Sequence, residues 1–148
     1  MSLRSILLRA YFSQRERAID TFRRHPVETQ ARMFRQLLRR GRRTEFGWRY
    51  NLGRIRTPEQ FASMVETFDY DTFKPYIERM LAGESDVTAP GRVTLFARSS
   101  GTTSDRSKYI PVTRDSLWWN HTLGMRDVAT LYAAAYPGTR VFDGKTLT

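Results

Sequence analysis

Apolar residues recur at spacings of three and four along the first part of the chain, which is the period of an amphipathic helix. The first stripe predicts a helix that ends before His25. The second stripe follows Pro26, a residue favoured in the first turn of a helix, and continues to Gly41, a residue suited to the position just past a helix end. The pattern therefore predicts two N-terminal helices.

Shorter elements follow in the middle of the chain. The segment from Thr44 to Trp48 is predicted to be a connector. Thr57, with Gln60 three residues later, has the pattern of a capping box and predicts the start of a short helix. A further helix is predicted from Tyr70 to Leu81, closed by Gly83.

The pattern changes to strands after Gly91. Two short runs rich in β-branched and aromatic residues, Val93–Ala97 and Tyr109–Thr113, predict strands. The segment between them, from Arg98 to Lys108, holds six hydroxyl side chains, one glycine and flanking cations. A helix from about Arg114 to Ala135 is predicted to follow. This half of the chain therefore has the pattern of a strand-loop-strand unit followed by a helix.

The charge is concentrated in the N-terminal part. The 148 residues carry a net charge of +10, and residues 1–56 hold 15 arginines against 4 acidic residues. Two interpretations stay open: a solvated helix surface, or a helical nucleic-acid-binding module in which arginine contacts phosphates and aromatic rings stack on bases. We expect the solvated surface and no specific nucleic-acid partner, with the nucleic-acid-binding module as the alternative.

Several chemistries are excluded by composition. The chain has no cysteine and two histidines, which excludes thiolate metal sites and makes a histidine-built metal site improbable, so no metal ligand is assigned. No run approaches the ~20 apolar residues of a membrane-spanning helix, and we expect a cytoplasmic protein without membrane partners. Residues 1–24 also have the Arg-rich, amphipathic format of a transit peptide, against which Glu16 and Asp20 count.

The hydroxyl-rich loop has two interpretations by composition. Gly101 would free backbone N–H groups, the hydroxyls would donate hydrogen bonds and Lys108 would add a positive charge, which together suit a nucleotide phosphate. A Ser/Thr-rich surface turn has the same composition. The loop is not a Walker A sequence, because the paired Gly-Lys-Ser/Thr end is missing.

The order of residues favours the nucleotide. The series Ser99-Ser100-Gly101-Thr102-Thr103, followed after four residues by Lys108, resembles the first nucleotide-binding motif of the adenylate-forming superfamily. The sequence from Ile6 onward resembles the auxin-responsive (Gretchen Hagen) acyl-acid amido synthetase family, especially its bacterial branch. The segments that carry this resemblance are Thr44–Gly47, Phe73–Met80, Lys108–Thr113, Tyr136–Gly138 and Phe142–Lys145.

This resemblance implies an α/β fold in which two N-terminal helices pack on the start of a larger adenylate-forming-type domain, here incomplete. Residues 1–148 would be the N-terminal part of that one domain: a basic helical region at 1–56, a helical connector at 57–92, and the phosphate-loop strands with their following helix at 93–148. The fragment alone is expected to be inactive. A non-catalytic remnant of a truncated gene remains an alternative.

The implied activity has two steps: a carboxylic acid reacts with ATP to give acyl-AMP, and an amine such as an amino acid then displaces AMP to form an amide. Mg²⁺ would screen the triphosphate, with no ligand assignable in this sequence. Lys108 would be the catalytic residue, acting electrostatically. The residues implied to bind ATP are Ser99, Ser100, Gly101, Thr102, Thr103, Ser104 and Lys108.

One position departs from the superfamily pattern. Asp105 stands where a glycine is usual, and its carboxylate would repel phosphate if it pointed inward. We expect Asp105 to face solvent beside Arg106.

Overall fold

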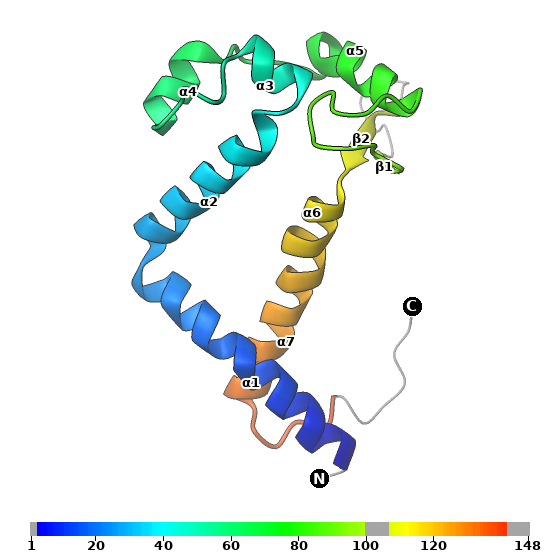
Figure 1. Ribbon diagram of the computed structural model, residues 1–148. Coiled ribbons are helices and arrows are strands. Elements are labelled where there is room, and N and C mark those ends of the chain that lie inside the picture. Colours follow the sequence, from blue (N-terminus) through cyan, green and yellow to red (C-terminus); the bar gives the residue numbers. More distant parts are fainter. Residues whose placement is uncertain (1–2, 100–106, 142–148) are drawn as a thin grey trace. The chain divides into compact units, whose positions relative to one another are not determined.

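The computed structural model describes residues 3–99 and 107–141, and Figure 1 shows their helices and strands. The chain divides into two compact units. The first unit combines Met1–Thr29 with Asp115–Thr148, and the second is Gln30–Arg114. The described residues are helix-rich and include a two-stranded sheet, consistent with an N-terminal α/β segment.

The first unit is built from α1 (Leu3–Arg24) packed against α7 (Leu123–Ala135). The predicted end of α1 before His25 is confirmed. Thr130 and Ala133 are buried on α7, and small side chains let two helices approach closely. The Thr130 hydroxyl lies 2.7 Å from the Arg126 carbonyl oxygen, to which it donates a hydrogen bond.

Polar contacts add to this helix pair. The Arg15 guanidinium donates to the Asp127 carboxylate, with 3.1 Å between Nη2 and Oδ2, and this hydrogen bond raises the pKa of Arg15. The Arg126 guanidinium lies 3.9 Å from the Tyr11 ring centroid and also donates to the Tyr11 carbonyl oxygen. Both contacts join residues more than a hundred positions apart, so they fix how α7 docks on α1.

The predicted helix from Arg114 to Ala135 is helical throughout but not uniformly α-helical. It begins as α6 (Arg114–Ser116), continues as a π-helical segment (Leu117–Thr122) and ends as α7. The Leu123 N–H donates to the Trp118 carbonyl oxygen five residues earlier, which is the π-helical pattern. Trp118 and Trp119 are 51% and 40% exposed, so neither belongs to a core here.

The second unit begins with α2 (Pro26–Gly41), although the first turn of this helix belongs to the other unit. The predicted start at Pro26 is confirmed, and the helix ends one residue later than predicted, because Gly41 is its last residue. The connector predicted at Thr44–Trp48 is wrong, because these residues form a short helix, α3 (Glu45–Arg49). Thr44 is its N-cap: the buried Thr44 hydroxyl oxygen accepts a hydrogen bond from the Gly47 N–H at 3.0 Å.

The predicted capping box of α4 (Pro58–Met64) is half formed. Thr57 accepts from the Gln60 N–H at 3.2 Å, as expected of an N-cap. The Gln60 side chain, however, accepts from the Arg56 N–H at 2.7 Å instead of the Thr57 N–H. The helix still begins where the pattern predicted, since one satisfied N-cap is enough to place a helix start.

The helix α5 (Tyr70–Leu81) has the bounds predicted from the sequence. Its start carries a complete capping box, in which Asp69 accepts from the Thr72 N–H and the Thr72 hydroxyl accepts from the Asp69 N–H. Threonine replaces the usual Glu or Gln at the third position, so the sequence pattern does not predict this box. Gly83 has a φ of 91°, the left-handed conformation that suits glycine after a helix end.

The two predicted strands pair as an antiparallel hairpin. The strand β1 (Leu95–Arg98) begins two residues later than expected and β2 (Tyr109–Val112) ends one residue earlier. Their register pairs Leu95 with Val112 and Arg98 with Tyr109. Val93, which the pattern predicts as part of the strand, instead precedes it and is buried in a cluster with residues of α5.

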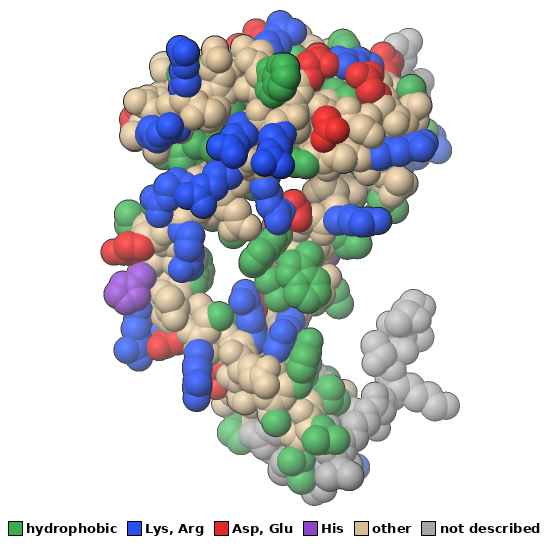
Figure 2. Space-filling model, in the orientation of Figure 1, with side chains coloured by type: hydrophobic (Ala, Val, Ile, Leu, Met, Phe, Trp, Pro, Cys, Tyr) green, Lys and Arg blue, Asp and Glu red, His purple; other side chains and the backbone are tan. Residues whose placement is uncertain are grey.

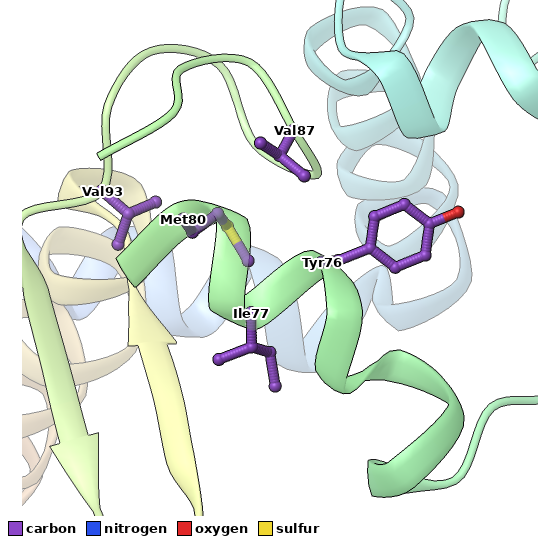
Figure 3. Packing of buried hydrophobic residues seen from close by; sticks show 5 residues of the cluster. All are labelled: Tyr76, Ile77, Met80, Val87 and Val93. Atoms are coloured by element: carbon purple, nitrogen blue, oxygen red, sulfur yellow. The ribbon is translucent and has the colours of Figure 1, made fainter. Parts of the chain in front are cut away.

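The core of the second unit centres on α5. Figure 3 shows the buried side chains of Tyr76, Ile77 and Met80 on α5, with Val87 and Val93 supplied by the segment that leads to β1. A second cluster joins Leu38 of α2 to residues after α3, and the half-buried Phe46 packs against both clusters. The hairpin is therefore anchored next to α5. No helix among the described residues has both the length and the apolar content to cross a bilayer.

Lowering the pH is expected to destabilise the second unit through the Arg79 cluster. Arg79 donates hydrogen bonds to Glu45 and Glu84, and these bonds lower the pKa of both carboxyl groups below their usual value of 4.5. A lowered pKa in the folded state gives stability that is full above pH 4.5 and is lost as the pH falls through the folded-state pKa. The melting temperature should therefore fall as the pH drops below about 4.5.

The matched variants are Arg79→Gln and Arg35→Gln, which remove the same charge from the same unit. Arg79→Gln should flatten the acid dependence of the melting temperature measured between pH 3 and 7. Arg35→Gln, at an exposed position on α2, should leave the acid dependence of the melting temperature unchanged. Equal acid dependence in Arg79→Gln and wild type would contradict this assignment.

Candidate functional site

The residues predicted to bind nucleotide lie on the connection between the two hairpin strands. Ser99 follows β1 directly and Lys108 precedes β2 directly. The structure therefore describes both ends of the predicted loop. The other predicted residues, together with Asp105, lie outside the described residues: Ser100, Gly101, Thr102, Thr103 and Ser104.

The two described ends are held together by a pair of hydrogen bonds. The Ser99 N–H donates to the Lys108 carbonyl oxygen at 3.0 Å, and the Lys108 N–H donates to the Ser99 hydroxyl oxygen at 3.0 Å. The Ser99 hydroxyl thus accepts a bond within the hairpin and keeps its own proton for donation. Hairpin pairing therefore brings the first and last residues of the motif side by side.

The same end of the hairpin is attached to α5 through Tyr70. The Tyr109 N–H donates to the Tyr70 hydroxyl oxygen at 2.9 Å. The Lys108 ammonium nitrogen lies 5.1 Å from the centroid of the Tyr70 ring, within the range of a cation–π interaction. Sequence reasoning missed Tyr70, because it lies 38 residues before Lys108 and carries no motif.

The electrostatic environment of this end includes Asp69, the N-cap of α5. Hydrogen bonds from the Thr72 backbone and side chain lower the pKa of Asp69, and the positive charge of Lys108 lowers it further. Asp69 is therefore ionised at neutral pH and bound to its own helix. The carboxylate stabilises the start of α5, and so it stabilises the position of Tyr70.

A histidine and two tryptophans with side chains suited to a binding site lie elsewhere. His121, Trp118 and Trp119 are exposed residues of the first unit, on the π-helical segment. A groove of about 250 Å³ runs between α1 and α7 in the same unit, lined by Phe12, Glu16 and small side chains. None of these residues belongs to the unit that carries Ser99 and Lys108.

The described residues include no cluster of side chains arranged as metal ligands for the Mg²⁺ expected with ATP. In residues 3–99 and 107–141 no three His, Cys, Asp or Glu side chains are grouped as metal ligands would be. Mg²⁺ prefers near-octahedral oxygen coordination and keeps several waters, so it commonly arrives with the phosphates. We therefore assign no Mg²⁺ ligand among the described side chains.

Arginine side chains cover α2 and the turn after it. Figure 2 shows blue basic side chains gathered on the α2 side of the second unit. The arginines of this surface are exposed, as expected for a solvated helix face: Arg32, Arg35, Arg39, Arg40, Arg42 and Arg43. On α2 itself, Leu38 and the half-buried Phe34 pack with Leu52 and Ile55.

The contacts above define a class of structure: a helical segment with a β-hairpin whose two strands are joined by a Ser/Thr-rich connection. Residues 15–148 match the GH3 family N-terminal domain. The chain belongs to the GH3 family, which confirms the family predicted from the sequence.

Individual relatives are amido synthetases. Over 100 residues, the chain is 29% identical to indole-3-acetic acid-amido synthetase GH3.2 of Arabidopsis thaliana, covering 67% of the chain and 18% of the relative. It is 27% identical to GH3.4, an enzyme of the same name and organism, over 117 residues, covering 77% of the chain and 20% of the relative. The chain thus spans about a fifth of these relatives.

Proposed function

We propose that these residues are the N-terminal part of an ATP-dependent acyl-acid amido synthetase of the adenylate-forming superfamily, in the bacterial branch of the family. The observation that carries the proposal is the family match, which runs through the whole Ser99–Lys108 segment. The relatives are named amido synthetases, enzymes that join an acid to an amine. In this proposal both described units are parts of one larger adenylate-forming domain.

The proposed reaction has two steps. First, a carboxylate oxygen attacks the α-phosphorus of ATP; a new P–O bond forms, the bond to the β-phosphate oxygen breaks and pyrophosphate leaves with its electrons. Second, an amine nitrogen attacks the acyl carbon, AMP departs from it and the nitrogen loses a proton. Activation is required because a carboxylate is a poor electrophile and has a poor leaving group.

In this scheme the loop between the strands binds the phosphates. Backbone N–H groups near Gly101 and hydroxyls of Ser99 to Ser104 would donate to phosphate oxygens. Lys108 would stabilise the negative charge that accumulates at the pentavalent transition state, without proton transfer. Mg²⁺ would enter with ATP, and no step is assigned to a protein-held ion.

The first test is acid-dependent exchange of labelled pyrophosphate into ATP by the longest natural polypeptide that carries these residues. Indole-3-acetate is the first probe, because the relatives are named for it, followed by a panel of aromatic and aliphatic acids. Exchange should require an acid, and adding amino acids should yield an amide. The 148-residue chain by itself should show no exchange.

Two results would contradict the proposal. Robust acyl-AMP formation by the 148-residue chain would refute its being only part of the catalytic domain. Failure of the longer polypeptide to exchange with any acid, combined with steeply salt-dependent and sequence-independent DNA binding, would favour the nucleic-acid module instead.

A further inference from the structure

We infer that Tyr70 is a positioning residue that sets the Lys108 ammonium for its role toward the phosphates of ATP. The inference rests on the proposed function, since it assigns to Lys108 the electrostatic role given above. It adds a residue that lies outside the Ser/Thr-rich motif, on a different element. Tyr70 is the first residue of α5, whereas Lys108 immediately precedes β2.

Tyr70 contacts two consecutive residues with two different parts of one side chain. Its hydroxyl oxygen accepts from the Tyr109 N–H at 2.9 Å, which fixes the backbone beside Lys108. Its ring lies 5.1 Å from the Lys108 ammonium nitrogen, which limits where the side chain reaches. The Tyr70 side chain therefore restrains both the backbone next to Lys108 and the Lys108 ammonium group.

Tyr70 is itself held in place from two sides. It is half-buried and packs against the buried cluster of Tyr76, Ile77 and Met80. Just before it, Asp69 forms the capping box with Thr72, so the backbone at the start of α5 is fixed. Tyr70 thus links the core of the second unit to an exposed lysine.

An exposed lysine side chain needs a fixed contact, such as the Tyr70 ring, to hold its ammonium group in one position. Its stem has four rotatable carbon–carbon bonds, and an ammonium without a fixed neighbour samples many positions. A carboxylate partner would hold the ammonium but would also compete with phosphate for its donors. The nearby Asp69 carboxylate is already hydrogen-bonded to Thr72. The ring face attracts the ammonium without adding a second carboxylate, which leaves N–H donors for an anion.

The placement is tested without nucleotide on the 148-residue chain by NMR. The ε-methylene protons of Lys108 should be shifted upfield by the Tyr70 ring, and the shift should persist in Tyr70→Phe and vanish in Tyr70→Leu. The Tyr109 amide proton should exchange faster in both variants, because both lack the hydroxyl acceptor. Lys74, which pairs with Glu78 on α5, is the internal control and should keep its shifts.

The functional arm is a double-mutant cycle in acid-dependent pyrophosphate exchange, using the longer polypeptide. Tyr70→Leu should lower kcat about fivefold, the size of an exposed cation–π contact, with a smaller change in the KM for ATP. Tyr70→Phe keeps the ring and should retain most of kcat. In the Lys108→Ala background, Tyr70→Leu should cause almost no further loss, because Tyr70 acts through Lys108.

The two arms separate failure of this inference from failure of the proposed function. An equal loss of kcat from Tyr70→Leu with and without Lys108 would overturn the inference. An unshifted Lys108 ε-methylene signal would overturn it as well. In either case, exchange activity of the wild type would leave the proposed function standing. A shifted methylene with no exchange by any acid would overturn the proposed function and, with it, the role given to Tyr70. Retained kcat in Tyr70→Phe and its loss in Tyr70→Leu would support the inference against a general folding defect.

Discussion

Replacing Lys108 with alanine is expected to lower acid-dependent pyrophosphate exchange about 30- to 800-fold, a loss of about 2–4 kcal/mol of transition-state stabilisation. The physical reason is that a preorganised charge is worth most where negative charge accumulates during phosphoryl transfer. The hairpin supplies the preorganisation: the Lys108 N–H and carbonyl are both bonded to Ser99, and its ammonium lies against the Tyr70 ring.

Two comparisons make the Lys108→Ala result specific. Lys74→Ala removes a lysine that forms an exposed ion pair on α5, and it should leave exchange within about twofold of wild type. Amide formation from preformed acyl-AMP should suffer less than exchange in Lys108→Ala, because pyrophosphate has already left. Wild-type exchange in Lys108→Ala, with an unchanged thermal melt, would mean that the segment is only a Ser/Thr-rich turn.

Replacing Gly47 with alanine is expected to destabilise the second unit by about 3 kcal/mol, near the upper end of the usual cost of overpacking. Gly47 is buried in α3, where an added Cβ would lie 1.9 Å from the Gly41 carbonyl oxygen and 2.8 Å from the Arg42 Cα. Because these are backbone atoms, no side-chain rotation relieves the clash. The end of α2 or the start of α3 would have to move.

The measurement is urea unfolding followed by far-ultraviolet circular dichroism. Gly53→Ala is the matched control, since it lies in the same unit and its Cβ would meet no atom within 4 Å. Gly53→Ala should unfold within about 0.5 kcal/mol of wild type, as surface substitutions commonly do. Equal midpoints for the two variants would show that α2 and α3 do not approach as closely as described.

The local sequence determined where most elements begin and end. Pro26 and Gly41 bound α2, Thr57 opens α4 and Gly83 follows α5, because caps, proline and glycine act within a few residues of their own position. The one-turn helix α3 escaped prediction. Five residues are too few to show a helical period, so the sequence predicts only a connector at Thr44 and the residues after it.

Part of the candidate site could likewise be predicted from the local sequence, and part could not. The spacing of Ser99 and Lys108 between two strand-like runs predicted that both would lie on one hairpin connection, and β1 and β2 do pair. The paired hydrogen bonds between these residues follow from that pairing. The place of Tyr70 in the site could not be predicted from the sequence, because its contacts with Lys108 and Tyr109 depend on how α5 packs beside β2.

The sequence by itself determined most of the helices, the hairpin, the family and the motif, all of which depend on residue types at short and fixed spacings. The partner of each apolar surface was decided only by the tertiary structure. In α1, the apolar residues Leu7 and Phe22 are exposed, whereas the Arg15 side chain and the carbonyl groups of Tyr11 and Phe12 contact α7. A helical period shows that a face is apolar, but the packing partner comes from a distant part of the chain, and only the three-dimensional arrangement selects it.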